Sequence, residues 1–284
     1  SIVRFSKLSG RLPYDVAVLE IDEAYAAKLA PVLKPRAAVL TNVLRDQLDR
    51  FGEIDHTAKL LYELAKHCTE LVAYNICDPR LRSIPRGTSA RTVSFGYAGK
   101  LSKLFPVDDN WHGKQMHRDT PPASYVLAAM NDAQIGVVSP VGKVVISRER
   151  LPGSHNALNL VAAMALLTSL FPSESFDFNK LQPPYGRGEL VMFGKKAFTL
   201  QLVKNPGGFM VAMNVHPEQP ALIVINDAIA DGRDVSWLWD IDASSLATRP
   251  AIYVAGTRAY DIANRLHYED IKAKSVITEV DHAV

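Results

Sequence analysis

Short apolar runs alternate with longer amphipathic stretches along the first part of the chain. The runs at residues 15–21, 37–41 and 71–74 are typical of buried strands, and residues 23–33 and 55–66 between them have the spacing of amphipathic helices. Strands that alternate with helices form parallel sheets, because each helix returns the chain to the same end of the sheet. This part therefore predicts an α/β fold with a mostly parallel sheet.

The pattern changes between residues 91 and 146. Short β-like pieces at 92–95, 124–130, 135–138 and 143–146 are separated by turn residues, which predicts an antiparallel addition to the sheet. An Ala- and Leu-rich helix is then expected over residues 156–170. It begins after Gly153 and Ser154 and ends before Pro172, residues that favour a helix start and a helix stop.

A second domain is predicted after the Pro-rich segment 181–184. Strands restart at 197–202, 221–225 and 251–255, which favours a second, Rossmann-like α/β domain. The boundaries that we expect are 1–182 and 183–284. The strand–helix unit at 251–266 is followed by few residues that could complete a sheet, so we expect the second domain to be incomplete.

Composition narrows the classes of function. The 284 residues are 48% hydrophobic and 22% charged, which suits a globular protein of two domains. A net charge of +2 excludes a dedicated nucleic-acid binder. The two cysteines, Cys68 and Cys77, exclude a disulfide framework and a four-cysteine zinc site. The apolar runs are too short to cross a bilayer and residues 1–15 do not resemble a signal peptide, so we expect a cytoplasmic protein that is not integral to the membrane.

Three carboxylates, on Glu20, Asp22 and Glu23, follow the first predicted strand. Open α/β sheets bind ligands at the carboxyl ends of their strands, so this position suits a metal ligand. Asp22 and Glu23 are equally explained as the cap of the following helix, which leaves Glu20 unexplained. We predict that Glu20 binds Mg²⁺.

Two further polar clusters lie where an α/β protein would bind a nucleotide. The segment 41–53 follows a strand and includes Asn42 and Asp46, although Arg45 and Asp49 could equally form an ion pair on a solvated helix. His155 and Asn156 open the apolar helix, whose N-terminus is suited to an anion. A glycine-rich phosphate loop is absent from the sequence.

The order of these motifs resembles the central domain of the Mur ligase family. Glu20, the polar cluster at 41–53, the pair His155–Asn156 with Asn159, and Gly186–Arg187 with Glu189 follow one another as in that family. The variant Asp-Gln-Leu-Asp-Arg at 46–50 and the stretches 202–208 and 225–240 resemble the MurT branch, the ligase-like subunits of lipid II isoglutaminyl synthase. The resemblance covers nearly all of the chain except about residues 98–150.

The resemblance implies an amidation reaction. ATP would phosphorylate the α-carboxylate of D-Glu in lipid II, and ammonia would displace the phosphate to give D-isoglutamine. A class I glutaminase of the GatD type would supply the ammonia, at the inner face of the membrane. Its Cys and His would be completed by an acid of this chain, for which Asp240 is the first choice and Asp242 the second. Trp237 and Trp239 would anchor that interface or fill the second core.

The resemblance implies further roles by motif match. Asn42 and Asp46 would face the acyl-phosphate site, and Glu20 would bind Mg²⁺. The cofactor-binding residues for ATP would include Glu20, His155, Asn156, Arg187, Lys204 and Asp227.

Three departures from the family pattern qualify these roles. The missing phosphate loop indicates that the sequence begins inside the ATP-binding domain. No structural zinc is expected, since residues 98–150 lack cysteine. Leu61 falls near the position of the carbamylated lysine of amino-acid-adding Mur ligases, which favours amidation. Two alternatives stay open: a stand-alone amino-acid ligase of the Mur or folylpolyglutamate type, and a non-catalytic scaffold for the glutaminase.

Overall fold

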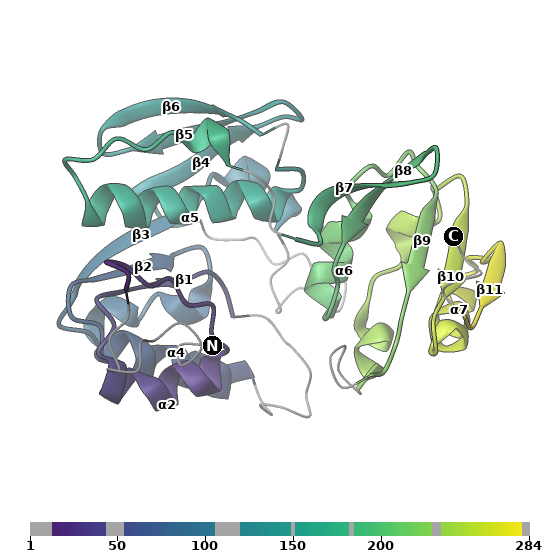
Figure 1. Ribbon diagram of the computed structural model, residues 1–284, viewed down its shortest axis with the longest axis horizontal. Coiled ribbons are helices and arrows are strands. Elements are labelled where there is room, and N and C mark those ends of the chain that lie inside the picture. Colours follow the sequence, from purple (N-terminus) through teal and green to yellow (C-terminus); the bar gives the residue numbers. More distant parts are fainter. Residues whose placement is uncertain are drawn as a thin grey trace.

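The computed structural model describes residues 13–43, 54–105, 120–148, 151–181, 185–228 and 234–279. The chain forms two lobes that lie side by side (Figure 1). The first lobe contains a large sheet with helices on both faces, and the second contains a hairpin and a smaller sheet. The predicted boundary between domains at residue 182 falls in a segment outside the described residues and stays a prediction.

The large sheet is mixed, and its described residues form six strands in sequence order. Neighbouring strands from the first to the fourth pair in parallel, and the last three pair antiparallel. The strands are β1 (Ala37–Leu40), β2 (Leu71–Asn75), β3 (Arg91–Tyr97), β4 (Tyr125–Met130), β5 (Gln134–Ser139) and β6 (Gly142–Ser147). The prediction of an α/β fold with a mostly parallel sheet is confirmed.

The prediction for residues 91–146 is only partly correct, because β3 and β4 belong to the parallel part of the sheet. Only the pairs β4–β5 and β5–β6 are antiparallel. In the described part of the β3–β4 connection, the only helix is the 3₁₀ helix η3 (Gly99–Leu104). Without an amphipathic helical stretch, the sequence carried no sign of a parallel crossover.

Strand β2 shows why this lobe folds as it does. All five of its residues are buried, and successive side chains point to opposite faces. Leu71 and Ala73 pack in the cluster of helix α5 (Ser154–Leu170), whereas Val72 and Tyr74 pack in the cluster of α4 (Ile54–Lys66). Helix α2 (Glu23–Leu33) packs against α4. The three helices that the sequence predicts here are therefore confirmed.

The predicted buried strand at residues 15–21 is wrong for this structure. Residues 16–22 have no regular secondary structure, and the side chain of Val18 is 92% exposed. Among the described residues β1 pairs only with β2, so the segment has no neighbouring strand to bond with. An apolar run becomes a buried strand only where a ladder partner satisfies its backbone. Asp22 does cap α2, because its carboxylate accepts a 3.0 Å hydrogen bond from the Tyr25 amide.

The second lobe holds an antiparallel hairpin and, in its described part, a three-stranded parallel sheet of order β11-β10-β9. A separate apolar core surrounds that sheet and includes the fully buried Phe209. The sequence missed β7 and β11, and β11 adds a third strand to this sheet. Whether the second domain is incomplete stays an expectation. The elements are β7 (Arg187–Phe193), β8 (Lys196–Gln201), α6 (Pro206–Met213), β9 (Ala221–Val224), β10 (Ile252–Ala255), α7 (Ala259–His267) and β11 (Ser275–Ile277).

Short 3₁₀ turns complete the described structure. They are η1 (Pro79–Leu81), η2 (Ile84–Arg86), η5 (Phe178–Lys180), η6 (Ser236–Asp240) and η7 (Ser244–Leu246). No helix in the described part of the chain is both long and apolar enough to cross a bilayer.

Candidate active site

Four of the residues that the sequence singled out come together where α5 meets β7. Asn156 is buried, and its side-chain amide donates to the carbonyl oxygens of Pro152 at 2.7 Å and of Arg187 at 3.3 Å. The Arg187 guanidinium lies 3.9 Å from the Glu20 carboxylate. His155 is the fourth residue, since the Arg187 charge acts on its ring. Segments more than 100 residues apart in sequence therefore build one site.

The imidazole of His155 is held neutral. Burial, together with the positive charges of Arg187 and Arg148, lowers the pKa of His155 to about 4, and burial has the largest effect. Its Nδ1 atom is buried and has no hydrogen-bond partner among the described residues. A neutral imidazole with a free nitrogen beside an arginine can bind a polar ligand that has to enter the site.

The start of α5 is shaped to leave its backbone amides available. Its N-cap, Gly153, has a φ of +89° and no side chain to satisfy them. A Cβ atom at Gly153 would lie 2.6 Å from the His155 ring, so glycine is required for this packing. An uncapped helix N-terminus beside Arg187 is suited to a phosphate group.

The carboxyl ends of β1 and β2 form a second polar cluster, around Asn75 and Asp78. Asn75 donates to the Thr41 carbonyl oxygen at 2.9 Å, and Asp78 accepts from the Val43 amide at 2.5 Å. These bonds fix the loop that carries Asn42, whose side chain is exposed. Asp46, Arg45 and Asp49 lie outside the described residues. Asn75 and Asp78 were missed as functional candidates, although an Asn that ends a buried strand and an Asp three residues later are a recognisable pattern.

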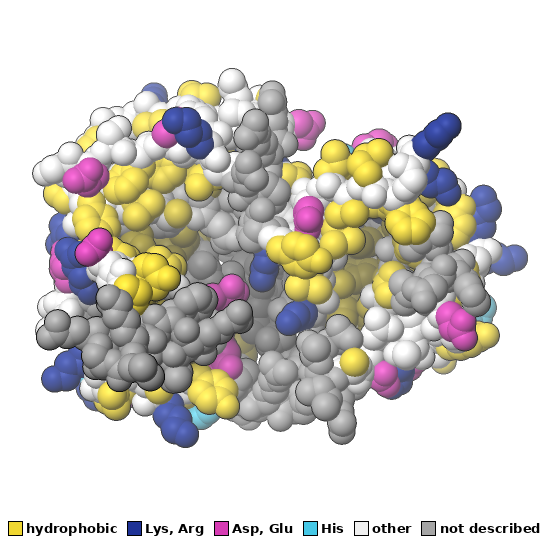
Figure 2. Space-filling view, in the orientation of Figure 1, with side chains coloured by type: hydrophobic (Ala, Val, Ile, Leu, Met, Phe, Trp, Pro, Cys, Tyr) yellow, Lys and Arg dark blue, Asp and Glu magenta, His cyan; other side chains and the backbone are white. Residues whose placement is uncertain are grey.

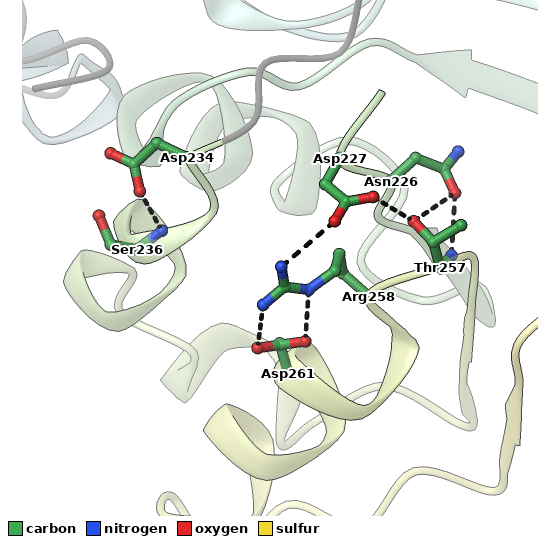
Figure 3. Close-up of polar contacts among 7 residues, drawn as sticks. All are labelled: Asn226, Asp227, Asp234, Ser236, Thr257, Arg258 and Asp261. Carbon is green, nitrogen blue, oxygen red and sulfur yellow. Dashed lines mark hydrogen bonds and ion pairs between the residues drawn. The ribbon is translucent and has the colours of Figure 1, made fainter. Parts of the chain in front are cut away.

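A third cluster lies at the carboxyl ends of β9 and β10 (Figure 3). Asp227 accepts from the Thr257 hydroxyl at 2.9 Å and from the Arg258 guanidinium at 3.3 Å. These two bonds lower the pKa of Asp227, with the larger effect from Thr257. Arg258 also makes two 2.8 Å bonds to Asp261. The predicted nucleotide-binding residue Asp227 is therefore engaged in an ion-pair network within the second lobe, and the structure does not bring it to the α5–β7 site.

Gly256 directly precedes Thr257 of this third cluster and has a backbone conformation that favours glycine. Its φ is +100°, and a Cβ atom there would lie 2.3 Å from the Ile225 carbonyl oxygen. We expect Gly256→Ala to lower the free energy of unfolding by about 2 kcal/mol, as measured by urea denaturation. Gly142→Ala is the matched control, because Gly142 also has a positive φ (+121°) but no atom within 4 Å. Equal effects of the two substitutions would show that the contact with Ile225 is unimportant.

Asp240 ends η6 and is half-buried, and no described residue bonds to its carboxylate. The backbone that follows it is fixed, because Arg265 donates to the Ile241 carbonyl oxygen at 2.7 Å. Asp242 differs, since its carboxylate accepts from the Ser244 amide at 3.0 Å. Of these two aspartates, Asp240 is therefore the freer to bind a partner.

The two tryptophans before Asp240 have different environments. Trp237 is buried in the second core against Phe209, with the ring centroids 6.2 Å apart. Trp239 is 51% exposed and packs edge-on against the exposed Tyr268 at 5.3 Å. Trp237 therefore fills the second core, and the interface role expected of these tryptophans stays a prediction for Trp239.

The residues present suit a magnesium–nucleotide ligand better than a closed metal site. Within the described ranges no three His, Cys, Asp or Glu side chains gather as a metal site. Glu20 is a single, almost fully exposed carboxylate, which matches Mg²⁺ because this ion takes one or two protein carboxylates together with phosphate oxygens. Leu61 is buried in the core, so that position offers no metal ligand. Lys204 is exposed one residue before Asn205, the N-cap of α6.

Comparison with known proteins gives the family. The model of the Mur ligase middle domain matches residues 6–167, more than half of the chain. The chain belongs to the Mur ligase family. The MurT ligase C-terminal model matches residues 202–284, so this Mur ligase carries the C-terminal domain of the MurT branch.

Relatives and solved structures agree with this assignment. The chain is 28% identical to the MurT subunit of lipid II isoglutaminyl synthase from Staphylococcus aureus (strain COL), over 92% of this chain and 67% of the relative. In fold it is similar to a pseudomurein peptide ligase type C from Methanothermus fervidus, with a TM-score of 0.68 at 18% identity, over 97% of this chain and 60% of that one. The structure of MurF from Thermotoga maritima in complex with ADP gives a TM-score of 0.62 at 18% identity. The match covers 90% of this chain and 55% of that one.

The S. aureus relative and the T. maritima structure are both longer than this chain. The chain spans about two thirds of the S. aureus relative and just over half of the T. maritima structure. The likeness to the two solved structures therefore establishes the fold, and activity, substrates and partners are treated as proposals below.

Proposed function

We propose that this Mur ligase is the ligase-like subunit of a two-subunit, glutamine-dependent amidotransferase. Its reaction would convert the α-carboxylate of D-Glu in lipid II to D-isoglutamine, with ammonia from a GatD-type class I glutaminase. The observation that carries the proposal is that one chain matches both the Mur ligase middle domain and the MurT C-terminal domain. The S. aureus relative, 28% identical over 92% of this chain, is named as a subunit of the glutamine-hydrolysing synthase.

The proposed chemistry has two steps. A carboxylate oxygen of D-Glu attacks the γ-phosphorus of ATP, which releases ADP and leaves an acyl phosphate. Ammonia then attacks the acyl carbon, the phosphate departs with the bonding electrons, and one proton is released as the amide forms. When bound, Mg²⁺ would neutralise charge on the phosphate oxygens.

The α5–β7 site supplies the protein groups for the nucleotide. Arg187 would hold phosphate oxygens by charge-assisted hydrogen bonds, with the uncapped amides of α5 beside it. His155, being neutral, would donate or accept a hydrogen bond through Nδ1 without adding charge. Glu20 would be the protein ligand of Mg²⁺, and Arg187 would return to Glu20 when the nucleotide leaves. Asn42 and Asp46 would face the acyl phosphate, and Lys204 would contact the nucleotide.

The second lobe would bind the glutaminase around Asp240. A carboxylate that no described residue engages can accept the imidazole N–H of a Cys–His pair and orient it. The neighbouring exposed pair Trp239–Tyr268 offers the kind of rigid aromatic surface that anchors interfaces. Its position next to Asp240 would place the partner's active site over this carboxylate.

The direct test of the proposal is reconstitution of the amidation. The chain, its cognate glutaminase, ATP, Mg²⁺, glutamine and lipid II are incubated together, and the stem peptide is analysed by mass spectrometry. We expect conversion of D-Glu to D-isoglutamine that requires every component. Amino-acid addition to the stem peptide by the chain alone would favour the stand-alone ligase, and complex formation without any ATP-dependent product would favour the scaffold.

The nucleotide site can be tested separately through Arg187. We expect Arg187→Ala to weaken the binding of Mg·ADP by about 10- to 100-fold, because a charge-assisted contact with phosphate is lost. Isothermal titration calorimetry measures this affinity. Arg36→Ala is the matched control, since Arg36 is another exposed arginine paired with a carboxylate, Glu70, but precedes the start of β1. Unchanged affinity in Arg187→Ala would remove Arg187 from the site.

A further inference from the structure

The hairpin of β7 and β8 presents an unusual apolar surface. Leu190, Met192 and Phe193 are 68%, 60% and 59% exposed. Leu190 and Met192 are two residues apart and therefore share a face of the hairpin, opposite Thr199 and Ala197. Phe193 follows Met192 and therefore points to the other face, so both faces of the hairpin end carry large exposed apolar side chains. This indicates a contact surface at the end of the hairpin.

The end of the hairpin carries charge of one sign. Residues 190–201 include two lysines, at 195 and 196, and no Asp or Glu, whereas Arg187 and Glu189 lie at the start of β7. Lys195 and Lys196 are exposed at the turn, and Phe193 pairs with Lys196 across it. Figure 2 shows yellow side chains over the hairpin, with dark blue ones where it ends at the upper right.

We propose that the end of the β7–β8 hairpin, residues 190–199, binds the surface of a membrane that contains anionic lipids. Apolar side chains beside lysines match an interface in which hydrocarbon lies beneath negatively charged headgroups. The long lysine stems would run along the apolar side chains while their ammonium groups reach the headgroups. A protein partner is less favoured, because residues 190–199 offer no acidic group for specific ion pairs.

This surface is distinct from the sites described above. It contains none of the residues assigned to ATP, to the acyl phosphate or to the glutaminase. The inference goes beyond the proposed function, and binding to vesicles that lack lipid II tests it without the enzymatic reaction. Failure of membrane binding would leave the amidation proposal standing, and failure of amidation would leave membrane binding standing.

The test is co-sedimentation of the full chain with two kinds of vesicle. One contains phosphatidylglycerol and phosphatidylcholine in equal parts, and the other contains phosphatidylcholine alone. We expect at least about tenfold tighter binding to the anionic vesicles, with a marked loss as salt is raised. Lys195→Gln with Lys196→Gln should weaken this binding roughly 20-fold, and Met192→Ser with Phe193→Ser should weaken it by at least about tenfold.

The other hairpin turn provides a matched control. Val141 and Lys143 are exposed at the turn between β5 and β6, so Val141→Ser with Lys143→Gln removes the same kinds of group. We expect this variant to bind vesicles like the wild type, and all variants to keep the wild-type unfolding midpoint, because the substituted side chains are exposed.

Three results would overturn the proposal. The first is that the wild-type chain does not bind anionic vesicles. The second is that the β5–β6 variant loses as much binding as the β7–β8 variants. The third is that sedimentation velocity shows a dimer that the β7–β8 variants dissociate, which would assign the surface to a second copy of the chain.

Discussion

Replacing Asp240 with Asn is expected to reduce glutamine-dependent amidation on the order of 10³-fold while the complex with the glutaminase still forms. An acid that completes a Cys–His pair holds the imidazole in its productive tautomer and stabilises its positive charge, and an amide of the same shape does neither. Binding should persist because the neighbouring pair Trp239–Tyr268 and the backbone held by Arg265 are unchanged.

Two controls separate this role from a general loss of activity. Amidation with ammonium chloride in place of glutamine should proceed at the wild-type rate in Asp240→Asn. Asp242→Asn should keep most of the glutamine-dependent rate, since the Asp242 carboxylate already bonds to Ser244. Full glutaminase activity in Asp240→Asn would remove Asp240 from the triad, and its loss in Asp242→Asn instead would assign the role to Asp242.

The first lobe is expected to become less stable as the pH is lowered, because of His155. The pKa of His155 is lowered from 6.5 to about 4, chiefly by burial. Between these values the unfolded chain binds a proton that the folded chain does not, so the free energy of unfolding rises with pH. The contribution of neutral His155 is therefore fully present above pH 6.5 and is lost as the pH falls towards 4. The loss amounts to at most about 3 kcal/mol.

The matched variant for this prediction is His155→Gln, which keeps a polar side chain but does not titrate. Urea denaturation at pH 7.5, about 5.5 and about 4.5 gives the free energy of unfolding for both proteins. The difference between them should shrink or reverse as the pH falls, because only the wild type has to keep His155 neutral. Parallel pH profiles would mean that the His155 ring is solvated in the folded protein.

Periodicity predicted the parts of the fold whose burial is regular. Strand β2 is apolar at its first four positions and is buried on both faces, and α4 and α5 have the spacing or apolar content of packed helices. The failures have physical causes. Residues 15–21 are mostly apolar but have no strand to pair with in the part of the chain that the structure describes. Strand β7 is largely exposed, so its sequence did not resemble a buried strand. Strand β11 has only three residues, all half-buried.

The candidate site was predictable in part, through the order of the motifs. Nothing in the local pattern around Glu20 indicates that Arg187 lies near it, because a contact between distant segments depends on the fold. The same applies to Asp227, whose partner Arg258 is 31 residues away. Asn75 and Asp78 hold the loop after β1 through backbone groups of Thr41 and Val43, contacts that sequence patterns do not reveal. Asp46 lies outside the described residues, and its role stays a prediction.

The measurement that tests the central claim most directly is glutamate release from glutamine by the cognate GatD-type glutaminase, with and without this chain. We expect the wild-type chain to stimulate release and Asp240→Asn to bind the glutaminase without stimulating it. A chain that neither binds the glutaminase nor changes its rate would contradict the amidotransferase assignment and would favour a ligase that works alone.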